Sequence, residues 1–324
     1  MRWNFESTKF FVFLSTAIVA NHAHSEADWV SVVWQNDVFL NVDGGGYTNG
    51  AFISLFDVSA EGSEVYTEPY LTRTLSWMLD EKDMAFSEQT LGQMMITPKD
   101  IKKSIPDAKD VPYAGLLFYR ASHVVVDANR ADMVTVIVGM VGPSSHAEDT
   151  QKFVHKVVDS PDPQGWDYQI KDQFVMALGR SALWRHELSD STDLVILAAA
   201  QVGNLKSSVS GSAILRWGSG LSESFVTSTL SYGGTTTPMA VNGGWNVYAG
   251  IESGYVFNDI FVNGDTPYKR QFSELHHEQF AVVSGISYAW QDVSVTFAFQ
   301  DIKPVDTVDQ SRDRFGSISL AFRL

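Results

Sequence analysis

The chain has 324 residues, 44% of them hydrophobic, with no cysteine and a formal net charge of −15. The absence of cysteine excludes disulfides, thiolate zinc sites and cysteine nucleophiles. The acidic balance argues against nucleic acid as a partner, because the phosphate backbone attracts basic surfaces. It is compatible with a cell surface on which divalent cations bridge anionic lipids.

The N-terminus has the three-part pattern of a secretory signal peptide. Two basic residues precede an apolar run at residues 10–20, and small residues follow at Ala23 and Ser25. The run is shorter than the roughly 20 residues that a membrane-spanning helix needs. We therefore predict that residues 1–25 are removed and that residues 26–324 form a single exported domain.

Polar residues mark the point where two strand-like segments meet near the mature N-terminus. Asn36 and Asp37 follow the first segment, and Thr48 lies in the motif that opens the second. Their amide, carboxylate and hydroxyl oxygens suit Ca²⁺ or Mg²⁺ better than a transition metal. A hairpin loop enriched in turn-forming residues explains the same composition. The motif alone leaves both interpretations open.

Alternation of large apolar residues with small or polar ones predicts β-strands along the mature chain. The pattern is clearest near the C-terminus, where Val293, Val295 and Phe297 alternate with Ser294 and Thr296. A period of two marks a strand with one apolar face, in soluble sandwiches as well as in barrels. We predict twelve strands, at residues 28–39, 47–58, 86–97, 113–126, 131–142, 170–187, 193–205, 208–218, 245–261, 278–290, 292–302 and 313–323.

Three features favour a transmembrane barrel over a soluble sandwich. The number of predicted strands is even, and the last strand contains Phe322 close to the chain end. Aromatic residues end many segments, as in the interfacial girdles of such barrels, namely Trp29, Trp34, Tyr119, Trp184, Trp217, Trp245, Tyr248 and Trp290. We therefore predict an all-β transmembrane antiparallel β-barrel of about twelve strands, with short helices in its extracellular loops.

Two segments depart from the strand pattern and predict short helices. Residues 66–79 repeat apolar side chains at helical spacing. Residues 145–159 begin with Ser145 and Glu148 at the spacing of a capping box, in which each side chain satisfies a free backbone amide.

The second predicted helix carries three polar residues in register. Gln151, His155 and Asp159 recur every four residues and so share one face. An amide, an imidazole and a carboxylate in this arrangement can hold a general base. The solvated face of an ordinary amphipathic helix accounts for the same spacing.

Six motifs occur in order along the chain and carry a resemblance to a known family. They are Asn36-Asp37, Tyr47-Thr48-Asn49-Gly50, Pro112-Tyr113-Ala114-Gly115, Val141-Gly142-Pro143, His155 and Gly165-Trp166-Asp167-Tyr168-Gln169. Together they resemble the outer-membrane lipid A 3′-O-deacylase family (LpxR type). The resemblance covers essentially the whole mature chain and is densest at 29–58 and 112–170.

The resemblance implies a twelve-stranded barrel in the outer membrane of a Gram-negative bacterium. The active site would lie between the barrel wall and a short helix on the outer-leaflet side. The implied reaction is hydrolysis of the ester that holds the 3′-acyloxyacyl chain of lipid A, with Ca²⁺ as the cofactor. The partners would be lipopolysaccharide and the membrane, and we expect the protein to act as a monomer.

The family pattern also implies roles for individual residues. His155 matches the catalytic histidine, and Gln151 matches an amide one helical turn earlier. Asn36, Asp37 and Thr48 match the residues around the calcium ion, and Asp37 is expected to contribute to catalysis as well.

Two further positions follow the pattern less closely. Lys103 aligns with a lysine of the site and is expected to bind a lipid A phosphate, for which a compact cation is suited. An acidic residue follows the histidine in some members. Here Pro161 occupies the aligned position, with Asp159 and Asp162 nearby.

The chemistry of these residues agrees with a water-based esterase. Hydrolysis without a serine or cysteine nucleophile needs an activated water and a stabilised oxyanion. The imidazole of His155 can accept the proton of that water. Oxygen ligands from Asn36, Asp37 and Thr48 would place a calcium ion where it polarises the ester carbonyl.

Two alternatives remain open from the sequence. The first is an outer-membrane phospholipase or another lipid esterase with a serine nucleophile. The second is a non-enzymatic barrel, in which the polar residues named above have no catalytic role. The motifs of zincins, α/β-hydrolases and dinucleotide-binding proteins are absent from the sequence.

Overall fold

The computed structural model describes residues 27–37, 46–59, 68–80, 84–226, 243–268, 274–303 and 312–324. The predicted signal peptide lies outside these ranges. Within them, no helix is both long and apolar enough to cross a bilayer.

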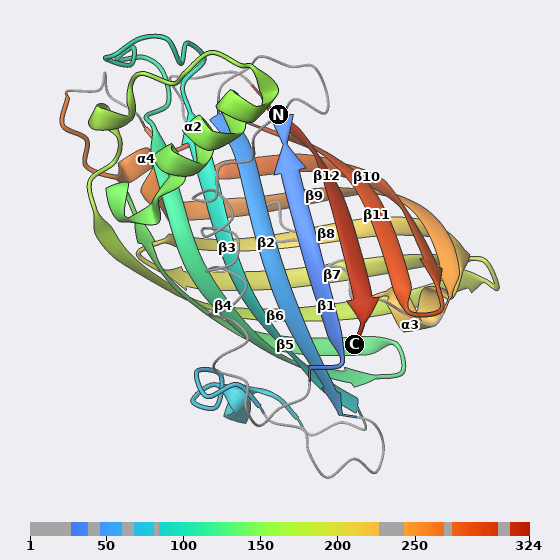
Figure 1. Cartoon of the computed structure of the whole chain (residues 1–324). Helices are drawn as coiled ribbons and strands as arrows, with labels where there is room; N and C mark the ends of the chain where they lie inside the picture. The colour runs from blue at the N-terminus through green and yellow to red at the C-terminus, as the bar shows by residue number, and fades with distance from the viewer. Residues whose placement is uncertain are drawn as a thin grey trace.

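The described strands form one closed antiparallel barrel of twelve strands, as predicted (Figure 1). Each strand pairs with its neighbours in sequence, and β1 closes the ring by pairing with β12. The strand boundaries all fall within three residues of those predicted. The strands are β1 (Trp29–Asn36), β2 (Gly46–Ser59), β3 (Met84–Thr97), β4 (Ala114–Asp127), β5 (Arg130–Val141), β6 (Gln173–Ser189), β7 (Thr192–Gly203), β8 (Lys206–Ser219), β9 (Gly244–Asp259), β10 (Glu278–Trp290), β11 (Val293–Ile302) and β12 (Asp313–Arg323).

The helical elements in the described residues are all short. They are the 3₁₀ turns η2 (Ser76–Met78), η3 (Pro143–Ser145) and η4 (Trp166–Tyr168), and the α-helices α2 (Ala147–Val158), α3 (Leu221–Ser224) and α4 (Ile260–Asn263).

The helix predicted at 66–79 is wrong for the described part of that segment. Residues 70–75 form consecutive turns that lead into η2. The hydroxyls of Thr72 and Ser76 donate to the carbonyls of Pro69 and Thr72, at 2.8 and 3.2 Å. Side-chain bonds of this kind offer the backbone an alternative to a continuous helix.

The apolar face of the strands points outward. On β11 and β12, Phe297 and Leu320 are exposed, whereas Thr296 and Ser319 are buried inside the ring. An apolar exterior around a partly polar interior is the arrangement of a membrane barrel and the reverse of a soluble sandwich.

The predicted aromatic girdle is partly wrong. Trp34, Trp217 and Trp290 are exposed on the outside, in agreement with the prediction. Trp29 and Tyr248 are only 4% exposed, because alternation along their strands turns them toward the interior.

Two of the apolar clusters inside the barrel lie toward its opposite ends. The first contains Phe56 and Phe86 together with Phe225 and Val226, which follow α3. The second contains wall residues and Ile170, Leu205 and Ile260, which come from connections at the opposite end. Loop residues therefore help to fill both ends of the described interior.

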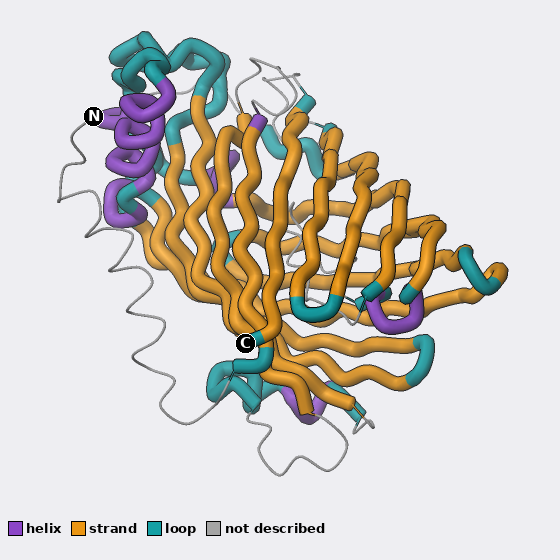
Figure 2. The backbone as a smooth tube through the Cα atoms, turned by 45° about the vertical axis from the view of Figure 1, so that its right-hand side comes forward, coloured by secondary structure: helices purple, strands orange, loops and turns teal. Residues whose placement is uncertain are grey.

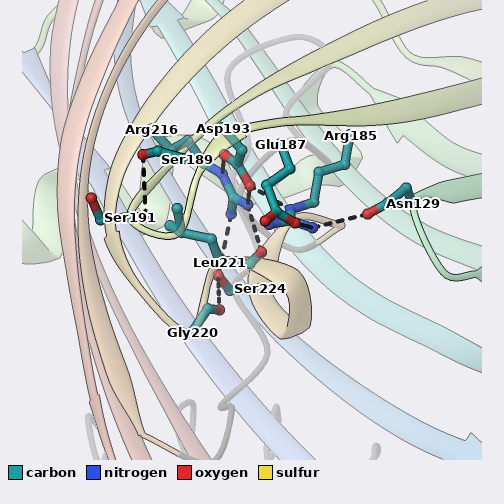
Figure 3. Close-up of polar contacts among 10 residues, drawn as sticks. All are labelled: Asn129, Arg185, Glu187, Ser189, Ser191, Asp193, Arg216, Gly220, Leu221 and Ser224. Atoms are coloured by element: carbon teal, nitrogen blue, oxygen red, sulfur yellow. Dashed lines mark hydrogen bonds and ion pairs between the residues drawn. The ribbon is translucent and has the colours of Figure 1, made fainter.

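A buried ionic network holds α3 at the end of the barrel where β1 begins and β12 ends (Figure 3). The guanidinium of Arg216 donates to both carboxylate oxygens of Asp193, at 2.9 and 2.7 Å, and neither side chain is exposed to solvent. The same guanidinium donates to the Leu221 carbonyl at 2.6 Å and to the Ser224 hydroxyl at 3.2 Å. Arg185 donates to the second Asp193 oxygen at 2.6 Å.

The two ends of the barrel differ in their connections. The end where β1 begins and β12 ends has three two-residue turns, at 128–129, 190–191 and 291–292. The opposite end has the longest connection between strands, at 142–172, which carries α2. Because barrels of this type have short periplasmic turns and longer extracellular loops, α2 lies at the extracellular end.

Candidate active site on the outer wall

Helix α2 packs against the outside of the barrel wall, over β3 and β4 (Figures 1 and 2). Gly115 makes this close approach possible: a Cβ atom there would overlap the Ser145 hydroxyl and the Ala147 methyl. Gly115 faces outward because its neighbours Ala114 and Leu116 belong to an interior cluster. The amide of Gln93, from β3, donates to the Ser145 carbonyl at 2.7 Å.

Helix α2 begins two residues later than predicted, and the capping box is wrong. Ser145 belongs to the preceding 3₁₀ turn, so its hydroxyl donates to the Gly142 carbonyl at 2.6 Å. The N-cap is His146, which has a left-handed backbone and makes no capping side-chain bond. Acidic residues in the first turn and basic ones in the last stabilise the helix dipole instead. The hydrogen bond to Glu148 raises the pKa of Lys152 within this helix.

A small aromatic cluster lies between α2 and the wall. It comprises Met95, Tyr113, Ala147 and Trp166, with the rings of Tyr113 and Trp166 4.8 Å apart. Burial raises the pKa of the Tyr113 phenol, whose hydroxyl donates to the Ile101 carbonyl at 3.2 Å. This cluster fixes the position of α2 on the barrel.

His155 lies one turn after Gln151 on α2 and is partly exposed. Its Nδ1 atom is 2.6 Å from the carbonyl oxygen of Pro161. A carbonyl can only accept, so Nδ1 carries the proton and Nε2 of the neutral ring is the acceptor. Asp159 does not extend the row of Gln151 and His155, because it is the C-cap and has a left-handed backbone with φ 55°.

Asn36, Asp37 and Thr48 lie where β1 ends and β2 begins, at the same end of the barrel as α2. Asn36 has the same parity along β1 as the exposed Val32 and Trp34, so it faces outward. It pairs with Asn49 across the ladder, and Asp37 follows it directly.

Thr48 faces the same outer surface because the strand is irregular at this point. The register with β3 shifts between Tyr47 and Asn49, and the Thr48 hydroxyl lies 2.7 Å from that of Thr97. Thr97 shares its parity on β3 with Met95, which lies beneath α2. A bulge of this kind re-aims a side chain. Tyr47 points inward instead and donates to Gln35 Oε1 at 2.5 Å.

Lys103 lies in the connection between β3 and β4, at the same end. Its ammonium is half exposed and lies 3.8 Å from Asp107. The backbone of this connection contacts the segment after α2, because Gln164 donates to the Ile101 carbonyl at 2.8 Å and Gly165 lies against the Lys103 carbonyl.

The structure thus places all six predicted site residues at one end of the barrel. Gln151 and His155 share α2, while Asn36 and Thr48 lie on the outer surface of the neighbouring strands β1 and β2. The oxygen donors of Asn36, Asp37 and Thr48 include one carboxylate, and such a hard, oxygen-only set fits Ca²⁺. Among the described residues, no group of three or more histidine, aspartate or glutamate side chains is placed to hold a metal ion.

The sequence did not reveal the residues that position α2 on the wall. Gly115 and Trp166 both occur in the recognised motifs, but nothing in their spacing indicates that one admits the helix and the other bonds to Gln151. The Trp166 indole donates to Gln151 Oε1 at 2.7 Å.

Replacing Gly115 with alanine is expected to displace α2 from the wall without unfolding the barrel. The added methyl meets the Ser145 and Ala147 side chains. Trypsin should then cleave after Lys152 or Lys156 faster than in the wild type. Gly211→Ala is the matched control, since a Cβ there meets only the Leu197 carbonyl, at 3.5 Å. Equal cleavage of the two variants would contradict the proposed packing.

The closed barrel, with its apolar exterior and a helix packed on the outer wall, defines an outer-membrane β-barrel protein. Residues 9–324 match the family model described as "Outer membrane protein LpxR". The chain belongs to the LpxR family and is therefore a protein of the Gram-negative outer membrane.

The fold is similar to those of solved structures to different degrees. LpxR from Salmonella typhimurium is 13% identical, with a TM-score of 0.75 over 91% of this chain and 100% of that chain. The β domain of the Bordetella autotransporter BrkA has a TM-score of 0.43 at 11% identity, over 92% and 99% of the two chains. The KdgM porin has a TM-score of 0.40 at 6% identity, over 91% and 99%. No curated protein matches the chain in sequence.

Proposed function

We propose that this protein is a calcium-dependent lipid A deacylase that hydrolyses the ester of the 3′-linked acyloxyacyl chain. Membership of the LpxR family and the placement of the polar residues on the outer wall support this proposal. The observation that carries it is the bond between His155 Nδ1 and the Pro161 carbonyl at 2.6 Å. That bond leaves Nε2 as a proton acceptor, which a general base requires.

The proposed reaction is a direct attack by water. As the water oxygen bonds to the ester carbonyl carbon, its proton moves to His155 Nε2. The bond from that carbon to the sugar oxygen then breaks, and His155 returns the proton to the leaving oxygen. The products are a free acyloxyacyl acid and a 3′-hydroxyl on the lipid A sugar.

Other side chains at the α2 end of the barrel would support this attack of water on the ester. Asn36, Asp37 and Thr48 would hold Ca²⁺, which when bound polarises the ester carbonyl and stabilises its negative charge. Lys103 has an exposed ammonium suited to a lipid A phosphate. Because these residues lie outside the ring of strands, the substrate would approach from the outer leaflet and not through the barrel.

The non-enzymatic porin alternative is less consistent with the interior. Phe225 and Val226 at one end, and Ile170 and Ile260 at the other, belong to apolar clusters inside the barrel. A porin keeps a polar, water-filled channel.

A serine-dependent phospholipase can be distinguished from a water-based esterase by labelling. A fluorophosphonate would modify the serine nucleophile of the phospholipase and would leave the water-based esterase unlabelled.

The test is mass spectrometry of lipid A in isolated outer membranes that contain the protein. With Ca²⁺ we expect loss of the mass of one acyloxyacyl chain. Chelation of calcium should lower the rate by about 10²-fold or more, as removal of an oxyanion-stabilising group does. Restoration by Ca²⁺ and not by Mg²⁺ would support an oxygen-rich site of large coordination number. Unchanged activity in the chelator would exclude the calcium proposal, and an unchanged lipid A mass in all conditions would exclude the substrate.

A further inference from the structure

We infer that Trp166 is a positioning residue: its indole fixes the orientation of the Gln151 amide, so that this amide presents its NH₂ group to the site. This inference rests on the proposed function, and it names a residue and a direction of hydrogen bonding that the reaction scheme above does not contain.

The orientation follows from the chemistry of the two groups. An indole N–H can only donate a hydrogen bond, whereas a primary amide has one accepting and one donating end. Trp166 Nε1 lies 2.7 Å from Gln151 Oε1, and the two residues are 1% and 3% exposed. The oxygen of the amide is therefore the end that points at Trp166, and the nitrogen points away from it.

The nitrogen end of this amide is available to a ligand. The hydrogen bonds of the described residues leave Gln151 Nε2 without a protein partner. Nε2 is also not among the polar atoms that are fully buried and unsatisfied. It therefore reaches the surface of the described chain, although most of the residue is buried.

Trp166 is itself held firmly. Its ring packs against Tyr113 at 4.8 Å, and the backbone after it bonds to Tyr113, the residue before β4. The Gln169 amide donates to the Trp166 carbonyl at 3.1 Å, and the Ile170 amide donates to the Tyr113 carbonyl at 2.9 Å. Gly165 admits this packing, because a Cβ there would overlap the Tyr113 ring. The indole thus cannot turn to accommodate the opposite amide orientation.

The position of the donor suits the reaction. Gln151 precedes His155 by four residues, so the two side chains lie on the same face of α2. A fixed amide N–H beside the general base is the kind of group that stabilises an oxyanion. A freely rotating amide would present its oxygen part of the time and repel the developing charge.

Three variants separate this role from simple packing. Trp166→Phe keeps the ring and removes the donor. Gln151→Glu keeps an acceptor for Trp166 and removes the N–H. We expect each to lower kcat by about 10²-fold with little change in KM, because the lost interaction is made in the transition state. The double variant should be no slower than Gln151→Glu alone. Trp77→Phe, at an 80% exposed tryptophan, is the matched control.

A second measurement, hydrogen exchange of the Trp166 indole, does not depend on catalytic turnover. In ¹⁵N-tryptophan-labelled protein, the Trp166 indole proton should exchange slowly in the wild type and in Gln151→Glu, and fast in Gln151→Met. Multiplicative losses in the double variant, full activity of Trp166→Phe, or fast exchange in the wild type would each overturn the inference. An inactive wild type with a slowly exchanging indole would contradict the proposed function and leave the Trp166 contact established.

Discussion

The His155→Ala protein is expected to insert normally and to deacylate lipid A about 10²- to 10⁴-fold more slowly than the wild type, the usual contribution of a general base. The imidazole is the group that accepts the proton of the attacking water, and the Pro161 carbonyl holds its acceptor nitrogen free. The rate is measured by mass spectrometry of lipid A in isolated membranes, at equal amounts of folded barrel.

Two further variants help to interpret the His155→Ala result. His186→Ala removes an exposed histidine of β6 and should leave the rate unchanged. His155→Gln retains a side chain that can donate to Pro161, and should be as slow as alanine if proton transfer is the essential role. Wild-type rates in both His155 variants would contradict water activation by this residue, and fluorophosphonate labelling would then be the next measurement.

Arg216→Ala is expected to cause the largest loss of stability, about 3–5 kcal/mol, because it removes a buried bidentate partner and leaves the Asp193 carboxylate with Arg185 alone. Arg216 and Asp193 are both fully buried, and the guanidinium also bonds to the Leu221 carbonyl and the Ser224 hydroxyl of α3. The free energy of unfolding is measured by urea titration of the vesicle-embedded barrel, followed by tryptophan fluorescence.

An exposed ion pair supplies the control for this prediction. Lys171 and Asp265 lie 2.6 Å apart but are more than half exposed, so Lys171→Ala should cost no more than about 1 kcal/mol. The double variant Arg216→Ala, Asp193→Asn should recover part of the loss, because it removes the buried negative charge that Arg216 no longer balances. Equal destabilisation by Lys171→Ala and Arg216→Ala would show that burial of the network contributes nothing.

The wall of the barrel could be predicted from the sequence because one short-range rule determines it. Residues such as Phe297 and Thr296 reveal their faces by alternation, and the same rule applies along every strand. The ionic network could not be predicted in this way. Asp193 and Arg216 are 23 residues apart and meet only because β7 and β8 are paired.

The turns at 68–80 show a second limit of prediction from the sequence. Their apolar residues have helical spacing, but the hydroxyls of Thr72 and Ser76 bond to nearby backbone carbonyls. Local competition between side chain and backbone decided the structure there.

The candidate site could likewise be predicted from the sequence only in part. Asn36 and Thr48 could be expected near each other, since they flank one hairpin connection, and Gln151 and His155 could be expected to share a helical face. The group that orients His155 is a backbone carbonyl, which no pattern of side chains can indicate. The packing of α2 over Gly115 depends on a contact between Gly115 and Ser145, which are 30 positions apart.

The position of α2 on the outer surface of the wall also determines how a substrate can be supplied. A lipid reaches that surface by lateral diffusion in two dimensions and never needs to leave the bilayer. The rate should therefore follow the mole fraction of lipid A in the membrane and be indifferent to the volume of the surrounding buffer. Diluting vesicles tenfold with buffer should change nothing, whereas diluting lipid A tenfold with phospholipid should slow the reaction.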